Sequence, residues 1–280
     1  MDCLPAETPR RGKTRRYAAG RKKFDRKERD SHFAKMFPNH ADRVSAEKAF
    51  HNARFSGGPH TRPGIKYYLA LEEWYRDYFF CIMALGARNI LELGAGTESL
   101  AVQIGHADFE FDSIDISEEA IAFAERHKRL SQARFSVDDA HHTQFAAGSF
   151  DLVIGRGILH HLDIPTACAE IKRVLKPGGR IVFGEPLDCN ALINLYRKLT
   201  PNIRSRDERP LSRESLKLLS SHFGKLDIRY YGFLTLGLAV LGLKSPRLLH
   251  RFDSFLLNTL GLGRFFAWAC LISSSASPRE

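Results

Sequence analysis

Two periodicities of hydrophobic residues divide the sequence. From Ala46 to Leu85 the apolar residues recur near helical spacing, interrupted by the breaker clusters Gly57-Gly58-Pro59 and Pro63-Gly64. This pattern predicts a helical N-terminal cap over residues 36–87. From residue 88 onward, short apolar runs alternate with amphipathic stretches, which is typical of strands separated by helices.

Residues 88–280 are therefore expected to form an α/β domain with a parallel sheet covered by helices on both faces. Strands are expected at Asn89–Leu93, Phe111–Ile116, Ala133–Val137, Phe150–Ile154, Arg180–Phe183, Leu226–Tyr231 and Phe265–Ser274. Helices are expected from about Ser99, Glu118 and Ser212 and over Ile164–Leu175. The segment Asn190 to Pro210 is polar and basic and predicts no element, whereas the leucine-rich Leu234–Gly263 predicts a helical insertion before the last strand.

The composition is that of a folded globular protein, with 44% hydrophobic and 26% charged residues. The net charge of +10 is concentrated at one end. Residues 1–35 hold twelve Lys and Arg against five acids and carry +7, so the other 245 residues carry only +3. This tail is expected to be disordered, because blocks of like charge repel. Two alternatives are binding to anionic lipid or nucleic acid, and translation that starts at Met36.

The sequence favours a cytoplasmic protein. Its five cysteines are far apart and form no C-x-x-C pair, so neither a disulfide framework nor a cysteine-rich zinc site is indicated. The charge-free run Tyr230 to Leu243 is 14 residues long, and a membrane-spanning helix needs about 20. The N-terminus lacks the apolar stretch of a secretory signal.

Chemistry is first indicated at the end of the first expected strand. Glycines at positions 94 and 96 allow a tight turn and close approach of a ligand, and the helix that follows offers free amides to an anionic group. Asp115 ends the second strand, where a carboxylate can accept hydrogen bonds from both ribose hydroxyls. A nicotinamide or flavin cofactor is disfavoured because position 99 is Ser99 rather than the glycine of the dinucleotide fingerprint.

Over residues 88–186 the sequence resembles the class I S-adenosylmethionine-dependent methyltransferases. The segments that carry the resemblance are Ile90–Thr97, Ile114–Ser117, Val137–Ala140, Gly148–Val153, Leu159–Leu162 and Arg173–Gly179. It implies a doubly wound, Rossmann-like sheet of seven strands in the order 3-2-1-4-5-7-6. It also implies S-adenosylmethionine as the cofactor and no metal ion.

The resemblance assigns roles to nine residues. Glu92 would order the loop and the methionine amino group, and Gly94, Ala95 and Gly96 would line the methionine half. Asp115 would take the ribose and Ile116 would pack on the adenine. Asp139 with Ala140 would receive the adenine edge, and Gly155 would face the methionine end. One departure is Glu98, which stands where the family usually has a third glycine and could weaken cofactor binding by its charge.

Several residues are candidates for the chemistry itself. His160 follows the fourth strand, where acceptors approach the methyl group in this family, and a histidine suits proton removal near neutrality. A role of the His160-His161 pair in starting a helix is the alternative. His141 and His142 are interpreted as structural, because adjacent side chains diverge too much to bind one metal ion. Glu185, Tyr67 and Tyr68 are weaker candidates.

The main functional hypothesis is a methyltransferase that acts on a small or lipid-like hydrophobic acceptor. Residues 234–263 would form a lid over the acceptor and contact the inner face of the membrane peripherally, with Lys244, Arg247 and Arg251 toward the lipid headgroups. Two alternatives are a nucleic-acid methyltransferase and a non-catalytic module that binds S-adenosylmethionine. The first is disfavoured because Gly155-Arg156-Gly157 stands where that branch has an Asn-Pro-Pro-Tyr type motif.

Overall fold

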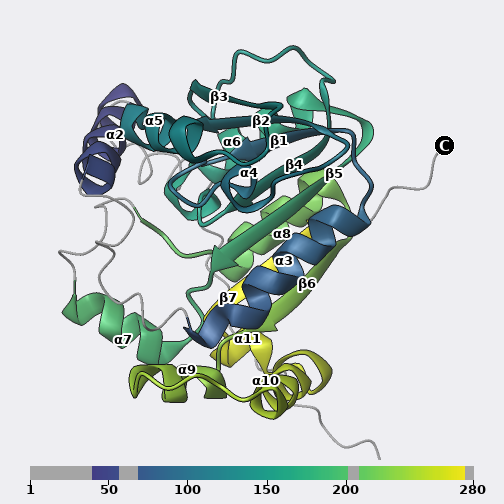
Figure 1. Cartoon of the computed structure of the whole chain (residues 1–280). Coiled ribbons are helices and arrows are strands. Elements are labelled where there is room, and N and C mark those ends of the chain that lie inside the picture. The colour runs from purple at the N-terminus through teal and green to yellow at the C-terminus, as the bar shows by residue number, and fades with distance from the viewer. Residues whose placement is uncertain (1–39, 57–68, 201–207, 275–280) are drawn as a thin grey trace, which may run out of the picture. The chain divides into compact units, whose positions relative to one another are not determined.

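The computed structural model describes residues 40–56, 69–200 and 208–274. These residues form a seven-stranded sheet with helices against both faces (Figure 1). The basic tail 1–35, the two breaker clusters, and Tyr67 and Tyr68 lie outside the described residues. No described helix is long and apolar enough to cross a membrane.

The sheet has the predicted strand order, β3-β2-β1-β4-β5-β7-β6. Its strands are β1 (Asn89–Leu93), β2 (Glu110–Asp115), β3 (Ala133–Val137), β4 (Phe150–Arg156), β5 (Leu175–Pro186), β6 (Leu226–Tyr231) and β7 (Ala269–Ser274). The longer helices are α2 (His40–Ser56), α3 (Glu72–Ala84), α5 (Glu118–His127), α6 (Ile164–Val174), α7 (Ala191–Leu199), α8 (Arg213–Phe223), α9 (Leu234–Val240) and α10 (Arg247–Ser254). Shorter turns are α4 (Leu100–Gln103), η3 (Leu159–His161), η5 (Phe255–Thr259) and α11 (Gly263–Phe266).

The topology places a crevice at the carboxyl ends of the central strands. β1 pairs in parallel with β2 on one side and with β4 on the other, so Leu91 lies between Asp112 and Val153. From β1 the chain continues outward to β2 and β3. It then returns to the other side of β1, where it forms β4 and β5. In sheets of this kind, ligands bind where the order reverses. Among the strands of the described residues, only β7 runs antiparallel to its neighbours, β5 and β6.

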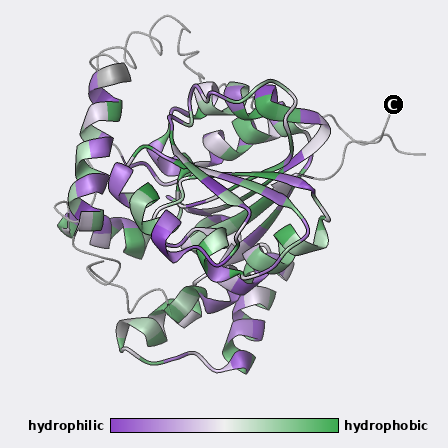
Figure 2. Cartoon of the chain, turned by 45° about the horizontal axis from the view of Figure 1, so that its top comes forward, coloured by the Kyte–Doolittle hydropathy of each residue, from purple (hydrophilic) through white to green (hydrophobic). Residues whose placement is uncertain are grey.

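Buried apolar residues on both faces of the sheet make the core, and Figure 2 shows hydrophobic residues along the central strands. On one face Leu91 and Val153 pack with residues of α6 and α8. On the other face Leu152 packs with Trp74 of α3. A Cβ at Gly184 in β5 would lie 2.6 Å from the Trp74 ring, so the glycine allows α3 to pack directly on the sheet.

Polar side chains fix where several helices begin. Ser117, Asp163, Asn190 and Ser212 each accept a hydrogen bond from a backbone N–H in the first turn of α5, α6, α7 and α8 respectively. Such caps satisfy amides that have no partner within the helix and contribute about 1 kcal/mol each. They set the loop lengths between the sheet and its covering helices.

The structure corrects three sequence expectations. The segment expected to be polar and irregular contains α7, which is amphipathic and capped by Asn190. The last strand begins at Ala269 rather than Phe265, because residues 263–266 form α11. The helix expected from about Ser99 is only the four-residue α4.

Candidate functional site

A cavity of about 1190 Å³ opens at the carboxyl ends of the central strands. It is lined by one face of α2, by the loops after β1, β2, β3 and β4, and by residues of α7, α9 and α11. The predicted cofactor residues that line it are Glu92, Gly94, Ala95, Gly96, Asp115, Ile116, Asp139 and Ala140. The fold therefore brings eight of the nine together in one hollow.

Gly155 is the ninth, and it is not among the lining residues. A Cβ at this position would lie 2.6 Å from Cγ2 of Ile158 and 2.7 Å from the Phe183 ring. The glycine thus allows the chain after β4 to fold back closely on the sheet. Its neighbours Arg156 and Gly157 do line the cavity.

Glu92 holds the loop after β1 in place. Its carboxylate accepts hydrogen bonds from the hydroxyls of Ser99 and Ser113 and from the backbone N–H of Leu100. Burial raises the pKa of Glu92, and the hydrogen bonds from the two serines oppose that rise. The buried acid ties its own strand, β1, to the start of α4 and to β2, which orders the glycine turn between β1 and α4.

The glycine turn and Asp115 form one unit. Gly94 and Gly96 have φ angles of 74° and 51°, a region that favours glycine. The Gly96 N–H donates to Oδ2 of Asp115 at 2.9 Å, and the Ser117 N–H donates to Oδ1 at 2.9 Å. Burial raises the pKa of Asp115, while these two N–H donors lower it. The carboxylate is therefore fixed at the edge of the cavity.

His141 connects the loop after β3 to α6. Its Nε2 accepts the backbone N–H of Asp163 at 3.0 Å, so the ring proton is on Nδ1, which lies 2.6 Å from Oδ1 of Asp139. The Asp139 side chain is thereby oriented, and its backbone is positioned at the cavity. This is the structural role that the sequence indicated for His141.

His160 and Glu185 form a buried pair. Nδ1 of His160 lies 2.7 Å from Oε2 of Glu185, whose Oε1 accepts the N–H groups of Ile158 and Leu159. Complete burial raises the pKa of Glu185, and the two backbone donors oppose the rise. A buried carboxylate on Nδ1 fixes the ring so that Nε2 can accept a proton. His160 itself lines the cavity.

Glu98, which replaces the usual glycine, has a cationic neighbour. Its carboxylate lies 3.2 Å from the Arg156 guanidinium, which also donates to the Glu98 carbonyl at 2.9 Å. The guanidinium is stacked over the rings of Tyr75 and Tyr78 of α3. Arg156 therefore offsets the charge that Glu98 places near the cavity. The sequence did not single out Arg156.

The helix α2 closes one side of the cavity through contacts with two of its loops. Asn52 accepts from the Ser117 hydroxyl at 2.6 Å and donates to Glu118, at the start of α5. Near its other end, Arg43 donates to the carbonyl oxygen of His161 at 2.6 Å. The sequence predicted a helical cap, but it gave no signal of which of its residues would face the cavity.

The far half of the cavity is apolar. Its apolar lining residues from α7, from α9 and its N-cap, from α11 and from the position before β7 are Ala191, Leu192, Ile193, Tyr196, Phe233, Leu234, Leu236, Phe265, Phe266 and Trp268, and Arg197 of α7 lines the cavity as well. The rings of Phe233 and Phe266 stack with centroids 5.0 Å apart. Asn190 joins this group, because its side chain both caps α7 and donates to the Phe266 carbonyl.

Asp253 of α10 holds α9 in position. Only 3% exposed, its carboxylate accepts the N–H groups of Phe233 and Leu234 and the hydroxyl of Thr235. Asp253→Ala is expected to lower the free energy of unfolding by about 2–4 kcal/mol, because two partly buried N–H groups and the buried Thr235 hydroxyl lose this acceptor. Thermal melts against Asp227→Ala, an exposed acid of β6, measure the difference. Equal melting temperatures would contradict this role.

Residues 91–183 match the family model described as a methyltransferase domain. Residues 91–183 therefore resemble a methyltransferase domain, and the sheet that contains them has the strand order that the class I resemblance implied. Two relatives are the demethylmenaquinone methyltransferase of Thermotoga maritima, 31% identical over 42% of this chain, and the O-methyltransferase rstn1 of Aspergillus nomiae, also 31% identical over 42% of this chain. The alignments cover 52% and 55% of those relatives.

Other relatives are much longer. The highly reducing polyketide synthase pks5 of Leptosphaeria maculans is 29% identical to this chain over 43% of the chain. That alignment covers 6% of the synthase. The chain therefore spans about half the length, or less, of the curated relatives it matches.

Solved structures share the fold of the methyltransferase domain. A methyltransferase from Thermotoga maritima, 18% identical, superposes with a TM-score of 0.58 and covers 81% of this chain and 99% of its own. The geranyl diphosphate C-methyltransferase of Streptomyces coelicolor, 16% identical, gives 0.55 and covers 86% of this chain and 100% of its own.

Proposed function

We propose that this chain transfers a methyl group from S-adenosylmethionine to a hydrophobic small molecule. One observation carries the proposal. A single cavity joins the glycine turn and Asp115 to an apolar half built by α7, α9 and α11, and His160 lies in its wall. The relatives named as a demethylmenaquinone methyltransferase and an O-methyltransferase support this class of acceptor.

The residues fit the cofactor on chemical grounds. Each oxygen of Asp115 accepts one backbone N–H, and a carboxylate oxygen can accept a second hydrogen bond, so two ribose hydroxyls can be bound. A Cβ added to Gly96 would have only the Phe55 ring within 4 Å, at 3.8 Å, so the turn leaves room beside the backbone. When bound, S-adenosylmethionine supplies a methyl group on a sulfonium sulfur.

The chain's own residues would orient the acceptor and move one proton. The apolar half of the cavity would exclude water and hold the acceptor close to the turn, which provides most of the rate of a simple displacement. Glu185 would hold Nδ1 of His160, and Nε2 would take the proton of a hydroxyl acceptor. Arg156 would compensate Glu98 beside the amino-acid half of the cofactor.

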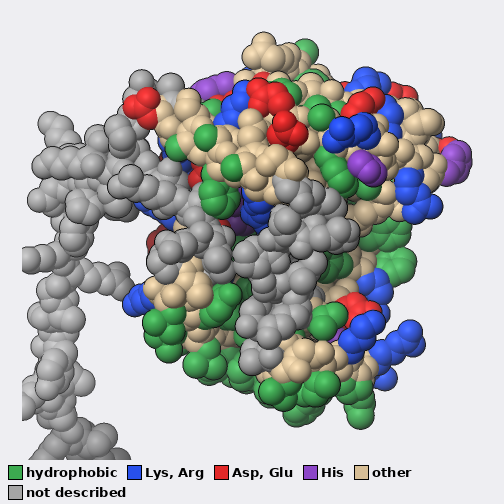
Figure 3. Space-filling view, turned by 60° about the vertical axis from the view of Figure 1, so that its left-hand side comes forward, with side chains coloured by type: hydrophobic (Ala, Val, Ile, Leu, Met, Phe, Trp, Pro, Cys, Tyr) green, Lys and Arg blue, Asp and Glu red, His purple; other side chains and the backbone are tan. Residues whose placement is uncertain are grey.

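A lipid-like acceptor is supported by the outer surface of the same helices. Leu192 of α7 is 75% exposed and Leu248 of α10 is 76% exposed. Figure 3 shows hydrophobic side chains gathered low in the view. The exposed large hydrophobic residues of α7 and of residues 241–255, here called the apolar surface, are Leu192, Leu195, Leu199, Leu241, Leu243, Leu248, Phe252 and Phe255. Exposed apolar patches of this kind mark binding surfaces. Lys244, Arg247 and Arg251 are exposed within the same segment.

We therefore propose that this apolar surface rests on an anionic membrane. The sequence suggested membrane contact through residues 234–263, and the present proposal adds α7 to the contact surface. The Leu192→Glu/Leu248→Glu double variant is expected to reduce flotation with anionic vesicles at least about tenfold, since each inserted leucine contributes roughly 1.5–3 kcal/mol. Phe80→Glu, on the exposed side of α3, is the matched control. Equal flotation of all three proteins would assign any binding to other parts of the chain.

The proposed activity is tested by transfer of labelled methyl groups. The full chain with labelled S-adenosylmethionine is incubated with lipid extracts and with water-soluble extracts. Label is expected in the lipid fraction. Label only in water-soluble products would exclude a lipid-like acceptor, and label in neither fraction would contradict the proposed transfer to a hydrophobic molecule.

A further inference from the structure

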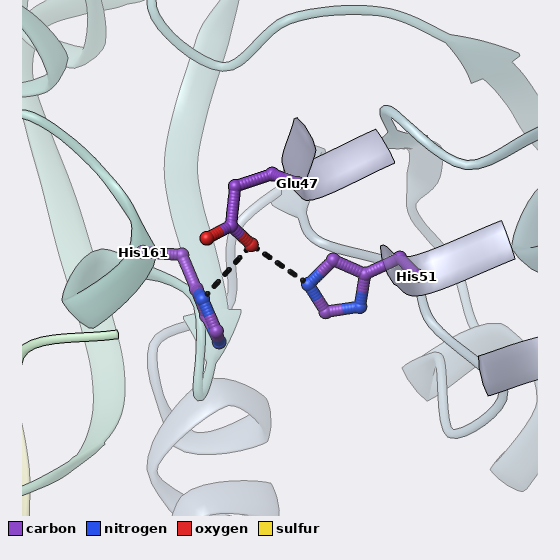
Figure 4. A group of neighbouring side chains, drawn as sticks. All are labelled: Glu47, His51 and His161. Atoms are coloured by element: carbon purple, nitrogen blue, oxygen red, sulfur yellow. Dashed lines mark ion pairs between the residues drawn. The ribbon is translucent and has the colours of Figure 1, made fainter. Parts of the chain in front are cut away.

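Three side chains that could bind a metal ion meet inside the cavity, although the sequence indicated none. Glu47 and His51 lie one turn apart on α2, and His161 comes from η3, after β4. Figure 4 shows the three side chains directed toward one another. Oε2 of Glu47 lies 3.3 Å from Nε2 of His51 and 3.3 Å from Nδ1 of His161.

These separations match those of ligands around one metal ion. Two ligands of a tetrahedral zinc ion, with bonds of about 2.0–2.1 Å, lie about 3.3–3.4 Å apart. A charge-assisted hydrogen bond between imidazole and carboxylate is shorter, at about 2.7–2.9 Å. The ligand atoms of all three residues lie within 4.8 Å of one another. The two 3.3 Å separations are therefore closer to those between ligands of one metal ion than to those of hydrogen bonds.

The surroundings favour this use. Glu47 is buried, and the side chains of His51 and His161 are only 15% and 10% exposed. The Arg43 guanidinium on the same face of α2 holds the His161 backbone through its carbonyl. Ligand positions supported in this way favour binding.

We propose that Glu47, His51 and His161 bind a divalent transition-metal ion such as zinc. Two imidazoles and one carboxylate leave a coordination position open, which is the pattern of catalytic rather than structural sites. All three residues line the cavity, so this position opens into it. An oxygen of the acceptor, from a hydroxyl, carboxylate or phosphate group, would occupy it; this role, unlike the binding of the ion, rests on the proposed function.

The test is titration of the chelator-treated full chain with Zn²⁺ by calorimetry and with Co²⁺ by visible absorption. One tight site is expected in the wild type. Glu47→Gln and His51→Gln should each weaken it at least about tenfold, whereas His106→Gln, a variant of a histidine that is 89% exposed, should leave it unchanged. Circular dichroism melts verify that each variant is folded.

Two results would overturn the proposal. One is the absence of a tight site in the wild type. The other is a site that survives Glu47→Gln and His51→Gln but is lost in Glu208→Gln, because Glu208 forms a neighbouring set with His160 and His161. Binding of S-adenosylmethionine, measured on the same preparation, separates failure of the metal site from failure of the proposed function.

Discussion

Replacing His160 with alanine is expected to lower the turnover number at least about a hundredfold with a hydroxyl acceptor found in the labelling screen. The reason is the pair with Glu185, whose Oε2 lies 2.7 Å from Nδ1 of His160 and orients the ring, so that Nε2 is the proposed acceptor of the proton. General-base catalysis of this kind contributes about 10²–10⁴-fold. Rate measurements at saturating S-adenosylmethionine give the effect on turnover directly.

A purely structural role for His160 predicts a different result. Loss of a contact in η3 would lower the melting temperature and leave turnover per folded molecule nearly unchanged. Cofactor affinity and thermal melts are therefore measured alongside the rate, with His106→Ala as a surface control. Near-normal turnover in His160→Ala would remove it from the mechanism and indicate an acceptor that loses its proton without help.

The second large effect is expected at Asp115. Asp115→Ala should weaken binding of S-adenosylmethionine and of its demethylated product by about 1.5–3 kcal/mol, or about 10–150-fold. The change removes the acceptor of the ribose hydroxyls and also frees the N–H groups of Gly96 and Ser117. Calorimetric titration of both ligands measures the loss.

Asp112→Ala is the matched control, because Asp112 lies on the same strand and pairs with Arg134 at the surface. It should reduce stability slightly and leave cofactor affinity unchanged. If Asp115→Ala bound the cofactor as tightly as Asp112→Ala, the assignment of Asp115 to the ribose would be wrong. A fall in melting temperature without a loss of affinity would limit Asp115 to holding the glycine turn.

The sheet was predictable because its determinants are local. The apolar runs of the strands are short-range patterns, and the resemblance supplied the strand order that the structure confirms. The glycine turn and Asp115 were also recognisable, since each ends a strand and parallel strands end at a common edge. Here local sequence and global topology agree.

The parts that the sequence did not predict depend on contacts between distant segments. Glu47 and His51 are 114 and 110 residues before His161, and only the folded chain brings α2 beside η3. The pairing of Glu98 with Arg156 likewise spans 58 residues. The leucines of α7 recur at helical spacing, but Arg197, Lys198 and the basic residues that follow made the segment look polar, and no helix was predicted there. Because Leu192 and Leu199 are exposed rather than buried, they do not give the usual core signal.

Calorimetric titration of the full wild-type chain with S-adenosylmethionine and with S-adenosylhomocysteine tests the central claim most directly. The turn at Gly94 and Gly96, the carboxylate of Asp115 and the adjoining cavity predict one binding site for each ligand per chain. A clear 1:1 binding isotherm for both ligands is the expected result. No binding of either ligand at millimolar concentration would contradict the proposal that this methyltransferase domain uses S-adenosylmethionine.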